Sequence, residues 1–84
     1  MFVGLNLHPK RYKMSTEKLT QFVKERRKMV GMTQLELSQR SGTGLRFIRE
    51  LEQGKTTLRL DKINQVLALF GHEMAPVEIE RGGK

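Results

Sequence analysis

Residues 33–56, TQLELSQRSGTGLRFIRELEQGKT, constrain the fold most, because signals that start and stop helices recur there at close spacing. Thr33 and Glu36 have the spacing of a capping box, in which each side chain binds the backbone amide of the other residue. Gly42 supplies the left-handed residue that ends the first short helix, and a second helix begins at about Leu45. We therefore predict two short helices joined by a glycine-containing turn.

The second of these helices has one apolar face and one charged face. Ile48 and Leu51 are three residues apart and face inward, and Gly54 ends the helix. Its first turn and outer flank carry Leu45, Arg46, Phe47, Arg49, Glu50 and Gln53. We expect Phe47 to be exposed or half-exposed. A short helix that presents two arginines is the kind of element that the DNA major groove admits.

The charge of the chain agrees with a polyanionic partner. The net charge is +7, and residues 1–72 hold 14 Lys/Arg against 6 Asp/Glu, whereas the last twelve hold 2 against 3. A basic surface attracts nucleic acid through its phosphates. The same composition also suits a soluble domain with solvated lysines, so the helix pattern carries the argument.

Other classes of protein find little support in the sequence. The 84 residues suffice for one small domain, and the absence of cysteine excludes disulfides and thiolate metal sites. His8 and His72 lie far apart, so we expect neither a metal site nor a cofactor. There is no catalytic constellation, apolar membrane span or secretory signal. We therefore expect a cytoplasmic protein that is not an enzyme.

The chain divides into three parts. Residues 1–14 form a flexible basic arm, or a leader upstream of a start at Met14. Residues 15–71 form the folded domain, in which Ser15 or Thr16 caps a first helix that ends at Gly31. That helix uses Leu19, Phe22, Val23 and Met29 or Val30 inward, and Met29 and Met32 are expected to fill gaps in the core.

A last helix is expected from about Leu60 to Phe70, ended by Gly71. Its apolar face is expected to consist of Leu60, Ile63, Val66, Leu67 and Phe70. The fold class is thus all-α, a compact arrangement of four to five helices.

Residues 72–84 form a C-terminal segment of different character. Val77 and Ile79 alternate with Glu78 and Glu80, which is the period of a strand. A lone strand leaves its backbone groups unpaired, so we expect it to pair with the same strand of a second subunit in a homodimer. The alternative is a frayed tail.

The sequence resembles the helix-turn-helix domain of the lambda/434 repressor–Cro and Xre family. The residues that carry the resemblance are Thr33-Gln34, Leu37, Ser41-Gly42, Ile48-x-x-Leu51-Glu52-x-Gly54-Lys55, Leu58, Ile63 and Leu67. The resemblance implies a lambda-repressor-like fold and a sequence-specific DNA-binding repressor that acts as a homodimer on a palindromic operator. Phe70 to Met74 and the expected terminal strand resemble HipB-type antitoxins, which implies a HipA-like serine/threonine kinase toxin as a partner. A protein that mainly neutralises a toxin and binds DNA weakly is the alternative.

The resemblance also implies roles for individual residues. Contacts to DNA bases fall on Leu45, Arg46, Phe47, Arg49 and Glu50, and contacts to the DNA backbone on Gln34, Thr43, Gly44, Lys55 and Thr56. Gln34 is alternatively a brace for the recognition helix, and Glu50 is alternatively paired to an arginine. Glu52 is expected to pair with Arg26 or Arg27 of the first helix, and Val77 and Ile79 to form the dimer contact.

Overall fold

Four helices follow one another along the chain in a computed structural model that describes residues 16–79. They are α1 (Glu17–Met29), α2 (Gln34–Ser41), α3 (Leu45–Glu52) and α4 (Leu60–Ala68), and the described residues contain no strand. The predicted all-α fold is therefore confirmed. The expectations for the basic arm, for a cap at Ser15 and for residues 80–84 fall outside the described part of the chain.

The signals at the start and end of α2 act as predicted. The Thr33 hydroxyl accepts a hydrogen bond from the Glu36 amide at 3.0 Å, and the Glu36 carboxylate accepts one from the Thr33 amide at 2.8 Å. Gly42 then adopts φ 73°, the left-handed conformation that ends the helix. This confirms both the capping box and the turn that separates α2 from α3.

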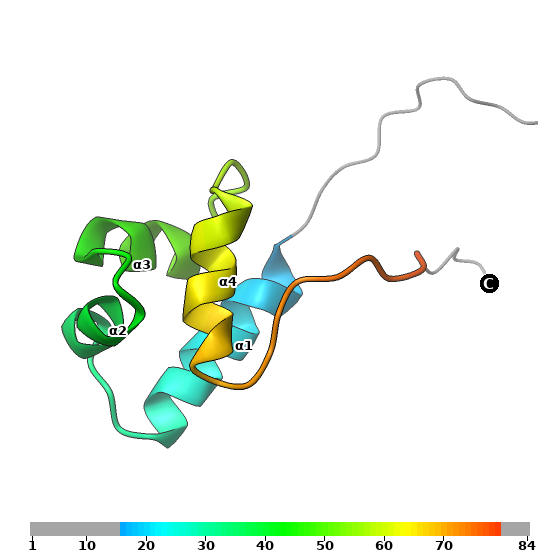
Figure 1. The fold of residues 1–84 in the computed structure, drawn as a ribbon. Coiled ribbons are helices and arrows are strands. Elements are labelled where there is room, and N and C mark those ends of the chain that lie inside the picture. Colours follow the sequence, from blue (N-terminus) through cyan, green and yellow to red (C-terminus); the bar gives the residue numbers. More distant parts are fainter. Residues whose placement is uncertain (1–15, 80–84) are drawn as a thin grey trace, which may run out of the picture.

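The core draws on all four helices. Its fully buried side chains are Val23, Leu37, Ile48, Leu51 and Val66, and Phe47, Ile63 and Leu67 complete the buried cluster. Leu19, Phe22, Met32, Leu58 and Phe70 pack around it, partly buried. Figure 1 shows α2 and α3 together at the left of the molecule, α4 in front at the centre, and α1 behind α4. The core thus supports the inner faces of α2 and α3 and leaves their outer faces free.

Polar contacts from α1 fix the end of α3. The Thr16 hydroxyl donates to the Gly54 carbonyl at 3.0 Å, and the Thr20 hydroxyl donates to the Leu51 carbonyl at 3.1 Å. Carbonyls at the end of a helix have few partners within that helix, so these bonds add to their hydrogen bonding; the Leu51 carbonyl also accepts from the Gly54 amide at 3.2 Å. The consequence is a fixed position of α3 relative to α1.

Some expected core residues lie at the surface instead. Met29 is 75% exposed, Val30 59% and Leu60 57%, so these three were wrongly predicted to face inward. Each lies at the end of a helix, where periodicity continues but neighbouring elements no longer cover the side chain. The helix α4 also ends at Ala68 rather than Phe70, because the amides of residues 69–71 bond three residues back instead of four.

The segment after α4 has no regular structure in the described residues 72–79. The Met74 amide donates to the Asn64 side chain at 2.8 Å, which ties the start of the segment to α4. In Figure 1 this segment, drawn in orange, runs away from α2 and α3. A strand needs a partner, so the pairing expected for Val77 and Ile79 stays a prediction.

Candidate nucleic-acid interface

The turn between α2 and α3 sets how α3 is presented. Gly42 and Gly44 both have positive φ, 73° and 93°. The side chains of Ser41 and Thr43 contact each other across this turn. The hydroxyls of Ser41 and Thr43 lie 2.8 Å apart, and both residues are buried. Gly44 is the N-cap residue of α3 and is exposed. The Thr43 hydroxyl is thus used inside the turn, and the expected contact of Thr43 with the DNA backbone stays a prediction.

The outer face of α3 carries the two predicted arginines. The Arg46 side chain is 90% exposed, and Arg49 is also exposed. Leu45, at the edge of this face, is half-buried. Because residues 46 and 49 are three positions apart, they lie on the same side of the helix. This face therefore offers two guanidinium groups to solvent on a helix of eight residues.

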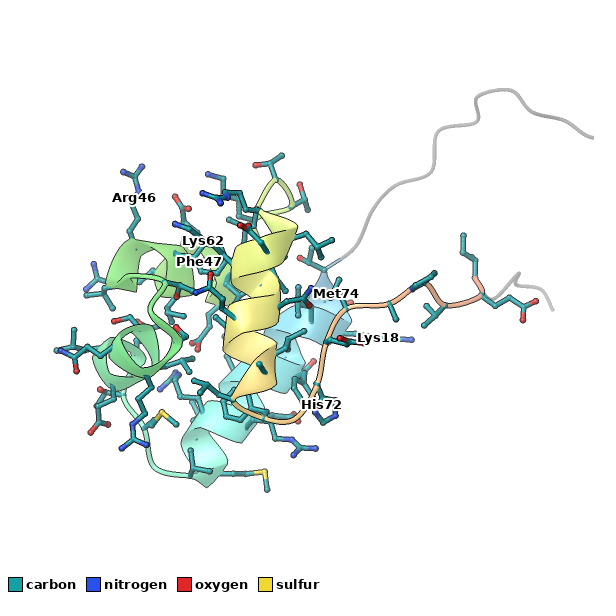
Figure 2. The ribbon with its side chains drawn as sticks, in the orientation of Figure 1. Lys18, Arg46, Phe47, Lys62, His72 and Met74 are labelled. Atoms are coloured by element: carbon teal, nitrogen blue, oxygen red, sulfur yellow. The ribbon has the colours of Figure 1, made fainter. Side chains whose placement is uncertain are left out.

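Phe47 lies inward, contrary to the prediction. It is 8% exposed and belongs to the core cluster. Its position on α3 is at the edge between the buried and the exposed faces, and there α4 covers it: the Lys62 ammonium lies 5.8 Å from the centre of the Phe47 ring. Figure 2 shows Phe47 and Lys62 next to each other, with Arg46 on the same side. Phe47 is consequently not available to contact a thymine methyl group.

Glu50 joins two basic side chains of the same surface. Its carboxylate lies 3.3 Å from Arg46 Nε and 3.5 Å from Lys55 Nζ, and the Glu50 side chain is 25% exposed. Glu50 is therefore paired to an arginine, which is the second of the two roles expected for it. Because Glu50 contacts only Nε of Arg46, the two terminal nitrogens of the guanidinium group remain as donors in its fork geometry.

An ion pair beneath this surface joins three helices. Glu52 of α3 accepts hydrogen bonds from Arg27 Nε and Nη2 at 2.8 and 2.9 Å, and from Gln34 Nε2 of α2 at 3.0 Å. Arg27 also donates to the Met32 carbonyl at 2.9 Å. The predicted partner of Glu52 is thus confirmed as Arg27, and the Gln34 side chain takes the bracing alternative.

The surroundings of this pair control its charges. Burial raises the pKa of Glu52, but the hydrogen bonds from Arg27 and Gln34 outweigh it, so the pKa lies below its ordinary value. The hydrogen bond to Glu52 raises the pKa of Arg27. Both groups are therefore charged near neutral pH, and their hydrogen bonds hold α1, α2 and α3 in fixed positions relative to one another.

The remaining candidate backbone contacts lie at the surface. Lys55 and Thr56, in the loop after α3, are exposed, and the Lys55 side chain is 47% exposed. Gly54, with φ 89°, ends α3, and the Lys55 amide bonds back to the Glu50 carbonyl at 3.1 Å. This closure turns the loop at Lys55 back beside Glu50. Val77 and Ile79, the candidate dimer residues, are 84% and 59% exposed.

One cation near this surface was missed by sequence reasoning. Lys62 lies in the first turn of α4, and nothing in the helical pattern distinguishes it from other surface lysines. Its contact with Phe47 joins two residues that are fifteen positions apart in the chain and lie on different helices, which periodicity within one helix does not reveal.

The family comparison agrees with this geometry. The Helix-turn-helix family model HTH_3 matches residues 23–74, which is more than half of the chain. This protein belongs to the helix-turn-helix family. The match supports the Xre and lambda-repressor type of domain, and it indicates a DNA-binding transcriptional regulator. No curated protein matches the chain.

Two structural findings limit other interpretations of residues 16–79. No group of three or more His, Cys, Asp or Glu side chains there is placed to hold a metal ion. No helix within the same residues combines the length and the apolar character that crossing a bilayer requires.

Proposed function

We propose that this helix-turn-helix protein is a non-enzymatic transcriptional repressor that reads DNA sequence through α3. The observation that carries the proposal is the exposed pair Arg46 and Arg49 on a short helix whose inner face is fixed to the core. The outer face enters the major groove, where an arginine forms two hydrogen bonds with guanine O6 and N7. Arg46, oriented through Nε by Glu50, is the residue we assign to this contact.

Contacts to the phosphates hold α3 in place. Lys55 and Thr56 follow α3 directly and are exposed, and the exposed Gly44 lets the backbone approach a phosphate at the other end of the helix. Such contacts set the register of a protein on DNA without reading sequence. Arg49, one turn after Arg46, contacts either a base or a phosphate in this arrangement.

The proposed active form is a homodimer. Val77 and Ile79 are exposed and alternate with acidic residues, so pairing of two C-terminal segments would bury apolar side chains and satisfy backbone groups. Two α3 helices about 34 Å apart would then enter successive major grooves of a palindromic site. Repression follows if that site overlaps a promoter.

Selection from a pool of random duplexes, at about 150 mM salt because affinity depends on ionic strength, tests this function. The wild type, Arg46→Ala and Lys18→Ala are compared, since Figure 2 shows Lys18 and Arg46 on opposite sides of the molecule. We expect an inverted repeat for the wild type and Lys18→Ala, and relaxed preference at one position of each half-site for Arg46→Ala. An unchanged preferred site in Arg46→Ala would remove the assignment of Arg46, and the lack of any enriched site would remove sequence-specific binding.

A toxin-neutralising role is the second candidate. Its support is the HipB-like stretch from Phe70 to Met74 and a set of exposed apolar side chains, namely Met29, Val30 and Leu35. Apolar groups exposed at such levels suit a protein partner. The proposed partner is a HipA-like serine/threonine kinase, whose coexpression and copurification with this protein is the test. A kinase that elutes separately from this protein would remove the toxin-neutralising role and leave the repressor function as the one candidate of the two.

A further inference from the structure

The cation of Lys62 has a different environment from three other cations, Arg46, Lys55 and Arg59, each of which is paired with a carboxylate. Arg59 is held by the Asp61 carboxylate at 2.6 Å, and Arg46 and Lys55 share Glu50. Lys62 forms no ion pair with any residue in the described range 16–79. Its positive charge is therefore not compensated by a neighbouring carboxylate.

The Phe47 ring restrains that charge. The Lys62 ammonium lies 5.8 Å from the ring centre, within the roughly 6 Å over which a cation is attracted to an aromatic face. Phe47 itself is 8% exposed and packed in the core, so the ring is a rigid support. A lysine held in this way loses less side-chain freedom when it binds a second group, since part of its rotamer freedom is already spent.

The supported ammonium lies along one edge of the exposed face of α3. Phe47 and Glu50 are three residues apart on α3 and therefore adjacent on its surface. Glu50 holds Arg46 and Lys55, so Lys62 extends the same group of basic side chains from α3 onto α4. Figure 2 shows Arg46, Phe47 and Lys62 on one side of the molecule and Lys18 on the other.

We propose that Lys62 binds a phosphate of the DNA backbone and that Phe47 is the residue that positions it. This inference rests on the proposed function, because it places the duplex against α3. The ammonium has three donors, and contact with a ring face leaves them for phosphate oxygens. The first turn of α4 then flanks the groove-reading helix, and Phe47 contributes to DNA binding from within the core.

Salt titrations of binding to a short random-sequence duplex test the role of Lys62. We compare the wild type, Lys62→Gln, Lys62→Arg and Lys18→Gln in the full chain, between about 50 and 200 mM salt. Each lost phosphate contact should reduce the slope of log K against log salt by about one, and affinity near 150 mM by about fivefold. We expect this loss for Lys62→Gln, near-wild-type slope for Lys62→Arg, and wild-type behaviour for Lys18→Gln.

Phe47→Leu supplies the second half of the test, because it keeps an apolar side chain in the core but removes the aromatic face. Lys62→Gln should then cost less affinity in the Phe47→Leu protein than in the wild type. An equal cost in both backgrounds would overturn the positioning role of Phe47. If the wild type binds with its full slope and Lys62→Gln keeps that slope, the assignment of Lys62 is wrong, whereas a wild type that binds no duplex overturns the proposed function itself.

Discussion

At the scale of single residues, two ion pairs of similar length are expected to contribute differently to the free energy of unfolding, because one is buried and the other is exposed. Arg27–Glu52 spans 2.8 Å with side chains 13% and 3% exposed, whereas Arg59–Asp61 spans 2.6 Å with side chains 68% and 61% exposed. Glu52→Gln leaves Arg27 without a countercharge, and breaking a buried pair costs about 3 kcal/mol or more. Asp61→Asn should leave the unfolding free energy unchanged, since exposed pairs contribute little. Urea denaturation of both variants measures the difference, and equal losses would contradict it.

Glu52 also makes the stability of the fold depend on pH. The pKa of Glu52 is lower in the folded protein than its ordinary value, so the unfolded chain binds the proton more readily. The stabilisation is fully present above the unfolded pKa of about 4.3 and is lost as pH falls through the lower folded pKa. The wild type and Glu52→Gln should therefore differ most near pH 7 and converge at acidic pH. A stability difference that is independent of pH between these limits would contradict this linkage.

Residue-level prediction succeeded where a partner is fixed by the fold and failed at the edges of helices. Resemblance to the family placed Glu52 opposite an α1 arginine, and the structure selects Arg27. Phe47 was assigned to the wrong side, because helical spacing locates it at a boundary and only the position of α4 decides that it is covered. No pattern within one helix contains that information.

At the scale of elements, the turn between α2 and α3 places a strict demand on its backbone. Gly44 has φ 93° and ψ 149°, a region that side chains other than glycine rarely adopt, although a Cβ there would meet no atom within 4 Å. Gly44→Ser introduces a good capping side chain but should still destabilise the fold by about 1–3 kcal/mol. Gly42→Asn is the matched control, since asparagine tolerates the left-handed conformation at φ 73°. Thermal unfolding compares them, and a Gly44→Ser protein as stable as the wild type would show that the turn adapts.

The elements themselves were largely predictable, because short-range chemistry defines their limits. The capping box at Thr33 and the glycine after α2 are local signals, and both were confirmed. Periodicity failed at Met29 and Leu60, the last residue of α1 and the first of α4, where the apolar pattern continues beyond the region that other helices cover. The path of residues 72–79 was not predictable in this way, since an alternating pattern forms a strand only with a partner.

At the scale of the whole molecule, the C-terminal segment carries two exposed apolar side chains away from α3. Val77 is 84% exposed and Ile79 59%, and the segment that carries them runs away from α2 and α3 (Figure 1). A dimer built through this segment leaves both α3 helices free for DNA. The proposed interface and the proposed reading surface are thus compatible on one small domain.

That arrangement predicts a specific loss of assembly. Ile79→Asp removes an apolar group from each side of a two-fold interface, which should cost at least about 3 kcal/mol and weaken dimerisation by more than about a hundredfold. Val30→Asp is the matched control, because Val30 and Ile79 are both 59% exposed but Val30 follows α1. Sedimentation should then give a dimer for the wild type and Val30→Asp and a monomer for Ile79→Asp.

Because two linked α3 helices bind a palindrome with higher avidity than one, Ile79→Asp should also lose affinity for the full site while keeping its affinity for a half-site. A monomeric wild type, or a dimer that survives Ile79→Asp, would show that the C-terminal segment does not join the subunits.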